Sequence, residues 1–326
     1  MPEKLLKDAL AGNAEAMFQL GTMYAFGNGV AVDLDEALHW LKKAAKAGHS
    51  TAEMVLQDIG QPMNVSTGNP NEVAKKELST GDTKTIVLPG GEEMEMIYCA
   101  PGSFIMGSPE NQVGRSDAEI QHKVTLTKGF WLGKYPVTQA QWECVMGHNP
   151  SESNKGYNYP VDSVSWYGCN SFIETINSQS SLNARFPTEA EWEYACRAGT
   201  TTVYHWGNSL NGDKANCDGN YPCGTRVKGR YLQKTSPVGV FDANPWGFYD
   251  MHGNVWEWCA DWYGIYPTKA ETDPKGPTSG SRRVVRGGGW DNGASCCASS
   301  TRGHNNPSDY YNTDGFRLAC SAGLHE

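Results

Sequence analysis

The sequence lacks the features that mark a membrane protein, a nucleic-acid-binding protein or a disulfide-stapled domain. No apolar run is long enough to span a bilayer or to act as a signal peptide. The net charge is −9, and basic residues never cluster beyond a pair, which argues against nucleic acid and anionic membranes as partners. The chain as written is therefore expected to be cytoplasmic, while export from a longer precursor stays open.

The ten cysteines form neither a CxxC pair nor a Cys/His metal spacing. In a chain of 326 residues this scatter indicates reduced, separately buried thiols. The alternative is one local disulfide between Cys217 and Cys223, which lie close together in a turn-rich segment.

The stretch from Asp291 to Asp314 contains no Leu, Ile, Val, Phe, Met, Lys, Glu, Gln or Trp. No helix or strand period fits it, because it offers almost nothing apolar to bury. Structureless loops of this length inside compact domains are uncommon and usually functional. Its Asn, Ser, Asp, Gly and Tyr are typical of antibody-type binding loops. We interpret it as a binding loop; the alternative is a surface loop of no consequence.

Residues 1–60 are predicted to be helical, with apolar residues at three- and four-residue spacing, a break at 27–29, an N-cap at Asp33 and a C-cap at Gly48. Segments 11–21 and 47–57 echo each other, which indicates stacked helical pairs. The pattern resembles the Sel1-like repeat, which implies a protein–protein contact; a mere N-terminal cap is the alternative. Residues 61–82 are rich in Pro, Asn, Ser, Thr and Gly and are predicted to be a linker.

Residues 83–326 are predicted to form one domain. Two short strands flank the Pro101-Gly102 turn, and two more lie within 122–138. Capping boxes at Thr138 and Thr188 start two helices, and a further helix is predicted over 163–176.

Seven blocks of this domain carry a family resemblance. In order they read PGSFIMGS, YPVTQAQWECVM, PVDSVSWYGCNSFI, RFPTEAEWEYACRAG, GFYDMHGNVWEWCADWY, RVVRGGGW and GFRLAC. Together they resemble the formylglycine-generating (sulfatase-modifying factor) domain over residues 85–322. The resemblance implies an α+β, C-type-lectin-like fold with much irregular structure. Fold alone does not decide function.

The enzymes of that family imply a copper ion held by two cysteines, at the third and eighth positions beyond the glycine block that ends at Gly289. Those positions are Asn292 and Cys297 in this sequence. Because soft Cu(I) prefers two thiolates, we expect no copper, no catalytic residue and no oxidase chemistry.

The loop also resembles that of variable proteins of diversity-generating retroelements, which rewrite Asn codons at their adenines. Such codons never yield Lys, Glu, Gln, Met or Trp. These five make up 67 of the 326 residues, so about five would be expected in a random window of this length. None occurs. The variable region is predicted to span 287–317, with Ala294, Cys297, Arg302 and Pro307 among its fixed residues.

The residues expected to contact ligand are those of the loop with hydrogen-bonding or flat aromatic side chains, together with its small members. They are Asp291, Asn292, Gly293, Ser295, Cys296, His304, Asn305, Asn306, Ser308, Asp309, Tyr310, Tyr311 and Asn312.

A second candidate site lies at residues 250–257, where two carboxylates flank a glycine turn, which suits a hard cation such as Ca²⁺. By the resemblance, Asp250 and Glu257 give side-chain oxygens to a structural calcium ion, and His252, Gly253 and Val255 give carbonyls. The alternative is a turn held by hydrogen bonds alone.

The sequence thus predicts a ligand-binding variable protein that contacts a protein or cell-surface ligand through residues 291–314. A second protein partner is expected at the N-terminal repeat. The alternatives are a copper-dependent formylglycine-generating oxidase and a non-enzymatic scaffolding adaptor.

Overall fold

The computed structural model describes residues 3–26, 33–52, 56 and 78–322. The chain divides into two compact units, Met1–Lys76 and Glu77–Glu326, and each is described by itself. The predicted break at residues 27–29 and most of the predicted linker lie outside the described residues.

The first unit is helical, as predicted, with α1 (Glu3–Leu10), α2 (Ala14–Phe26) and α3 (Leu34–Lys46). Asp33 caps α3, because its carboxylate accepts a hydrogen bond from the N–H of Glu36 at 3.0 Å. Gly48 follows the helix with φ 87°, as expected for a C-cap. A Cβ on Gly21 would lie 2.8 Å from Cγ of Leu41, so a glycine is what allows α2 and α3 to approach closely.

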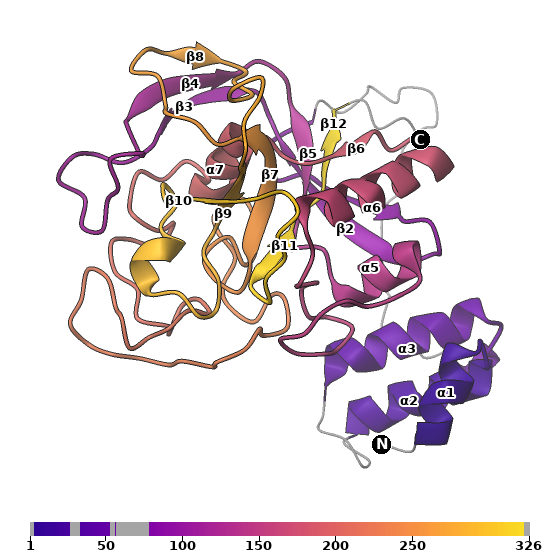
Figure 1. Ribbon diagram of the computed structural model, residues 1–326. Helices are drawn as coiled ribbons and strands as arrows, with labels where there is room; N and C mark the ends of the chain where they lie inside the picture. The colour runs from indigo at the N-terminus through magenta and orange to yellow at the C-terminus, as the bar shows by residue number, and fades with distance from the viewer. Residues whose placement is uncertain (1–2, 27–32, 53–55, 57–77, 323–326) are drawn as a thin grey trace, which may run out of the picture. The chain divides into compact units, whose positions relative to one another are not determined.

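The second unit contains three sheets (Figure 1). Their strand orders are β1-β2-β5-β12-β6, β10-β9-β7-β11 and β3-β4-β8. The strands are β1 (Thr83–Val87), β2 (Glu93–Cys99), β3 (Gly102–Met106), β4 (His122–Leu126), β5 (Phe130–Gly133), β6 (Ala184–Arg185), β7 (Trp256–Trp262), β8 (Glu271–Thr272), β9 (Arg283–Arg286), β10 (Arg302–Asn305), β11 (Asp314–Phe316) and β12 (Ala319–Ser321). The two strands predicted around Pro101 are confirmed as β2 and β3, and the two predicted within 122–138 are confirmed as β4 and β5. β2 pairs with β5 and β3 pairs with β4.

Three longer helices belong to this unit: α5 (Gln139–Met146), α6 (Trp166–Gln179) and α7 (Glu189–Arg197). Both predicted capping boxes are confirmed, at Thr138 and at Thr188. The predicted start of α6 at residue 163 was wrong by three residues. Ser165 is the N-cap, and Ser163 has φ 60°, a left-handed conformation that an α-helix cannot include.

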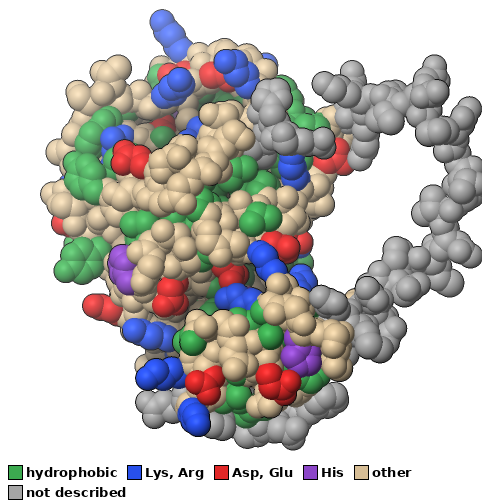
Figure 2. Space-filling view, turned by 90° about the vertical axis from the view of Figure 1, so that its right-hand side faces the viewer, with side chains coloured by type: hydrophobic (Ala, Val, Ile, Leu, Met, Phe, Trp, Pro, Cys, Tyr) green, Lys and Arg blue, Asp and Glu red, His purple; other side chains and the backbone are tan. Residues whose placement is uncertain are grey.

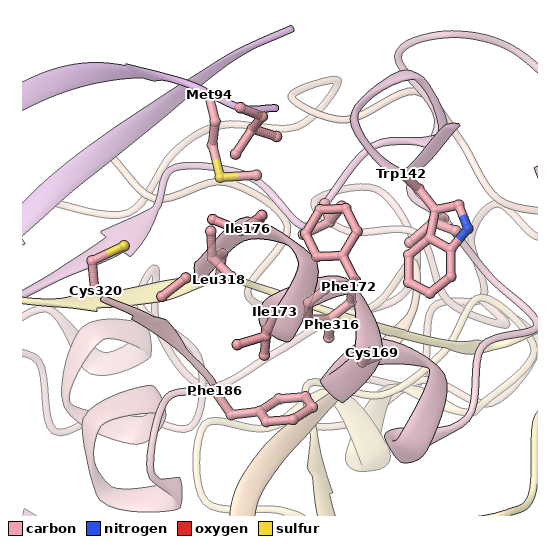
Figure 3. Packing of buried hydrophobic residues seen from close by; sticks show 14 of the residues in the cluster. Met94, Trp142, Cys169, Phe172, Ile173, Ile176, Phe186, Phe316, Leu318 and Cys320 are labelled. Atoms are coloured by element: carbon pink, nitrogen blue, oxygen red, sulfur yellow. The ribbon is translucent and has the colours of Figure 1, made fainter. Parts of the chain in front are cut away.

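The main core lies between α6 and the sheets (Figure 3). Phe172 stacks on Trp142 of α5 at 5.3 Å and meets Phe316 edge-on at 5.4 Å. Phe316 ends β11, and β12 then pairs with both β5 and β6. The segment that closes the predicted loop is therefore built into the centre of the domain.

On the face drawn in Figure 2, basic and acidic side chains are interspersed among polar ones. All ten cysteines are free, and eight of them are buried, so the prediction of reduced thiols is confirmed and Cys217 is not bonded to Cys223. Within the described residues, no helix has the length and apolar character needed to cross a membrane.

A buried ion pair fastens the end of the loop to β7. Arg317 donates to both carboxylate oxygens of Glu257, at 2.9 and 2.8 Å, and to three backbone carbonyls. Glu257 also accepts a hydrogen bond from the indole of Trp192 at 2.7 Å. Both charged side chains are fully buried, so each depends on the other for its charge partner.

Replacing Arg317 with methionine is expected to lower the free energy of unfolding by about 3–5 kcal/mol, because Glu257 would be left as a buried, unpaired charge. Urea unfolding followed by tryptophan fluorescence measures this loss. The matched control is Arg115→Met, since Arg115 pairs with the fully exposed Asp117 at 3.3 Å and should cost less than about 1 kcal/mol. Equal losses in the two variants would contradict the role of the buried pair.

Candidate functional site

The loop begins at a block of three glycines, two of which have a backbone conformation that favours glycine. Gly287 and Gly288 have φ 96° and 80°, in the region that other residues rarely adopt. A Cβ on Gly288 would lie 2.6 Å from Sγ of Cys297. The chain therefore turns sharply after β9 and passes close over the buried thiol.

Two arginines hold the stems of the loop to one carboxylate. Arg286, at the end of β9, donates to Glu189 at 3.0 Å and to Glu193 at 2.6 Å. Arg302, at the start of β10, donates to both oxygens of Glu189 at 2.7 and 2.8 Å. Because Arg286 and Arg302 are also partners in the antiparallel register, the two stems are fixed side by side on α7.

The prediction that no regular structure occurs within 291–314 was wrong for two short segments. Residues Ala294–Cys297 form a 3-10 turn, η1, and Arg302–Asn305 form β10 against β9. All four residues of β10 are half-buried. This strand is held by backbone pairing and by Arg302, and not by alternating apolar side chains, so the sequence pattern carried no signal for it.

Asn292 stands where the family's enzymes would require a cysteine, and it serves as a brace. Its amide oxygen accepts from the indole of Trp256 at 2.6 Å and from the N–H of Gly289 at 3.0 Å. Its backbone carbonyl accepts from the N–H of Asp218 at 2.8 Å. The amide oxygen predicted to contact ligand is thus engaged within the domain.

The neighbouring thiols are protected. Cys297 is fully buried, and contact with the thiol of Cys217 together with burial raises its pKa well above the usual value. Cys296 is half-buried, and its pKa is also raised by burial. Thiolates are the nucleophilic and metal-binding form, and the surroundings of both sulfurs disfavour that form.

The tip of the loop, residues 306–312, is tied down through its backbone (Figure 1, between β10 and β11). The carbonyl of Pro307 accepts from the N–H of Tyr167 at 3.3 Å, and that of Tyr311 accepts from the N–H of Ser163 at 3.0 Å. The indole of Trp290 donates to the carbonyl of Asn312 at 3.1 Å. Meanwhile the side chains of Tyr310 and Tyr311 are 64% and 51% exposed. The tip therefore has a backbone of fixed course and two exposed tyrosine side chains.

The residues predicted to contact ligand fall into two groups, and none of them is buried. The exposed group is Asp291, Asn306, Ser308, Tyr310, Tyr311 and Asn312; the half-buried group is Asn292, Gly293, Ser295, Cys296, His304, Asn305 and Asp309.

Two half-buried members have clear partners within the domain. His304 lies against Tyr263 with ring centroids 4.2 Å apart. The amide of Asn305 donates to Asp314 at 2.8 Å, where burial raises the pKa of the Asp314 carboxyl to about 7. The exposed tip is therefore the freest part of the predicted surface.

Both carboxylates of the glycine turn at 250–257, those of Asp250 and Glu257, already have hydrogen-bond partners within the domain. Asp250 accepts from the N–H of Gly239 at 2.7 Å, burial raises its pKa to about 6, and Glu257 is taken by Arg317. The described residues hold no group of three or more His, Cys, Asp or Glu side chains placed to bind a metal ion. A calcium ion would compete with Arg317 for Glu257, so calcium binding by residues 250–257 stays a prediction.

Sequence reasoning missed a pocket of about 370 Å³ beside the loop tip. Its wall includes Trp142, Ser163, Ser165 and Gly168, together with the exposed Tyr310. These residues come from α5, from the start of α6 and from the loop, so no local spacing could have grouped them.

Comparison with known proteins agrees with this architecture. The model of the Sulfatase-modifying factor enzyme 1-like domain matches residues 84–322, and that of the Sel1 repeat matches residues 14–49. The serine/threonine-protein kinase pkn1 of Chlamydia caviae is 33% identical over 81% of this chain and 47% of its own length. The formylglycine-generating enzyme of Mus musculus is 35% identical over 61% of this chain and 53% of its own. The chain therefore spans about half the length of these relatives.

Among solved structures, variable protein 1 of Treponema denticola superposes with a TM-score of 0.64 at 28% identity, covering 73% of this chain and 99% of that one. The predicted α+β, C-type-lectin-like fold and the helical repeat are confirmed. With a family model that spans most of its length, the chain belongs to the family of the sulfatase-modifying factor enzyme 1-like domain and carries a Sel1 repeat before it.

Proposed function

We propose that this protein binds a protein ligand through residues 291–314, and that this stretch is the variable loop of a diversity-generating retroelement. The observation that carries the proposal is how the backbone of the tip is held to the domain. Its backbone is tied at Pro307, Tyr311 and Asn312, while the side chains of Tyr310, Tyr311 and Asn312 are exposed. Side chains can therefore change without loss of the ties, and a preformed loop loses little conformational entropy on binding.

The division between fixed and changeable residues supports the proposal. Of the residues expected to stay fixed, each of which has a possible codon without adenine, Ala294, Cys297 and Pro307 are buried and Arg302 is bound to Glu189. Most of the others, which a mutated Asn codon can produce, are exposed or half-buried. Ala298, Ser299, Ser300, Thr313 and Asp314 are the buried members of this second class. The similarity to variable protein 1 of Treponema denticola points in the same direction.

The similarity to formylglycine-generating enzymes supports a second candidate, a copper-dependent oxidase. The site favours binding over this chemistry. The amide oxygen of Asn292 already accepts hydrogen bonds from Trp256 and Gly289. The raised pKa of Cys297 keeps its sulfur protonated at neutral pH.

The third candidate is a scaffolding adaptor, and it rests on the Sel1 repeat at residues 14–49. Helical repeats of this kind present surfaces for protein contacts. A contact there is compatible with ligand binding at the loop, because the two surfaces belong to different units.

The DNA around the coding sequence gives the most direct test. We expect a reverse transcriptase gene nearby and an imperfect repeat of the codons for residues 287–317, with differences confined to adenines of the repeat. Absence of both from the sequenced locus would overturn the variable-loop proposal.

Changing the tip should leave the fold intact. The double variant Tyr310→Ser, Tyr311→Ser is expected to alter the free energy of unfolding by less than about 0.5 kcal/mol for each substitution, because both side chains are exposed. The control Arg302→Ser should cost about 3–5 kcal/mol, since Glu189 would lose its bidentate partner. Urea unfolding compares them, and a large loss in the tyrosine variant would show that the tip is structural.

Copper titration with an oxygen-uptake assay on a cysteine-containing peptide separates binding from oxidation. We expect no turnover, because Asn292 offers no thiolate and Cys297 is held as a thiol. Oxygen uptake that disappears in Cys297→Ser would instead establish the oxidase.

A further inference from the structure

A pocket of about 330 Å³ is built by elements of two of the three sheets. Its lining residues come from β3, β4 and β8 of one sheet and from β7 and β10 of another, together with the start of α7. Figure 1 shows the first three strands together above α7. The segment that links β7 to β9 also lines the pocket, through residues 264–267 and 274–277.

Asp261, in β7, brings a carboxylate oxygen without a partner to this pocket. The residue is 4% exposed, and its Oδ2 accepts from the N–H of Glu189 at 2.8 Å. Its Oδ1 accepts no hydrogen bond within the described residues and is not one of their fully enclosed polar atoms. A Cβ on Gly276, which also lines the pocket, would lie 3.2 Å from this Oδ1. Oδ1 therefore faces the space that the glycine leaves open.

The charges around Asp261 leave it short of a cation. Burial and then the charge of Glu189 raise the pKa of the Asp261 carboxyl to about 8, so no neighbouring cation holds it ionised at neutral pH. Besides Asp261, the titratable side chains of the pocket wall are His122, Glu189, Tyr266, Glu271, Lys275 and Arg302.

The cations near Asp261 are engaged elsewhere or lie in solvent. Arg302 donates to both oxygens of Glu189 and to the carbonyls of residues 118 and 264. Arg283 stacks on the rings of Trp166 and Trp262 at 4.0 and 3.6 Å, and Lys275 is exposed. A positive group that enters the pocket would therefore stabilise the ionised form of Asp261.

The rest of the wall suits an alkyl chain. Met106, Pro267, Pro274 and Pro277 line the pocket, and Ile265, which is 89% exposed, places its side chain at the opening. Methylene groups packed against such a wall are removed from water. A short hydrocarbon chain that ends in a positive charge satisfies both the wall and the carboxylate.

The single open oxygen decides between the two common organic cations. A guanidinium group binds best when both oxygens of a carboxylate accept its parallel N–H groups. Here Oδ2 is already occupied by the N–H of Glu189. An ammonium group acts as a point charge and needs only one acceptor, so it fits Oδ1 better.

We propose that this pocket binds an alkylammonium group, either the side chain of a lysine on another protein or a free primary amine. The ammonium donates to Oδ1 of Asp261, and its alkyl chain lies along the methionine and the prolines toward Ile265. This site is separate from the loop tip, and the proposal does not rest on the variable-loop function.

The test follows the δ1-methyl resonance of Ile265 in the full chain with ¹³C-labelled isoleucine methyl groups, assigned by its loss in Ile265→Val. The probes are n-butylammonium and, as an uncharged analogue of the same length, n-butanol. At pH 8 we expect a saturable shift with n-butylammonium and binding of n-butanol at least about tenfold weaker, a difference of roughly 1.4 kcal/mol. No shift, or equal affinity for the two probes, would overturn the proposal.

The affinity for n-butylammonium should also rise with pH. Only the ionised form of Asp261 attracts the cation, and its population grows as the pH approaches about 8. The amine itself stays protonated in this range, since alkylammonium groups lose their proton near pH 10.4. We expect binding at least about tenfold tighter at pH 8 than at pH 6. An affinity that does not change with pH would contradict a role for Asp261.

The variant Asp261→Asn keeps an oxygen for the N–H of Glu189 and removes the charge. It should bind n-butylammonium at least about tenfold more weakly at pH 8 and lose the rise in affinity with pH. The matched control is Asp117→Asn, at an exposed carboxylate outside the pocket, which should bind as the unmodified chain does. Unchanged binding by Asp261→Asn would overturn the assignment. If that variant does not fold, the pH series on the unmodified chain decides.

A further probe, Nα-acetyl-lysine N-methylamide, distinguishes the two sources of the amine. Affinity equal to or greater than that of n-butylammonium identifies a lysine of a protein as the ligand group. A loss of tenfold or more identifies a free amine, because the peptide part is then excluded. Neither outcome depends on the DNA around the coding sequence, so this proposal and the variable-loop proposal can fail independently.

Discussion

The structure depends on Glu189, a buried carboxylate that both stems of the loop share. Burial works to raise its pKa, but the charges of Arg302 and Arg286 lower it on balance, so it remains ionised inside the protein. Two guanidinium groups and one carboxylate leave one excess positive charge, and Glu193, which pairs with Arg286, supplies the second negative charge. Because breaking one partner leaves the others uncompensated, the stems are fixed whatever the loop carries beyond them.

That arrangement divides the loop into the tip, residues 306–312, and a frame, which is the rest of residues 287–317. In the frame, Asn292 shows how a position suited to chemistry in related enzymes can become structural. Its amide oxygen accepts two hydrogen bonds with fixed directions, which a thiol, a weak acceptor, would not provide as well. The bond from Tyr167 to the carbonyl of Pro307 and the bond from Trp290 to the carbonyl of Asn312 hold opposite ends of the tip, so the course of its backbone is set within the domain.

The features that could be predicted from the sequence are those that depend on residues close together in the chain. The capping boxes at Thr138 and Thr188 involve residues three positions apart, so the local sequence predicts where each helix begins. β10 could not be predicted, because its stability comes from Arg302 meeting Glu189, 113 positions earlier. The pairing of Glu257 with Arg317 could not be predicted for the same reason, because the guanidinium lies 60 positions later in the chain.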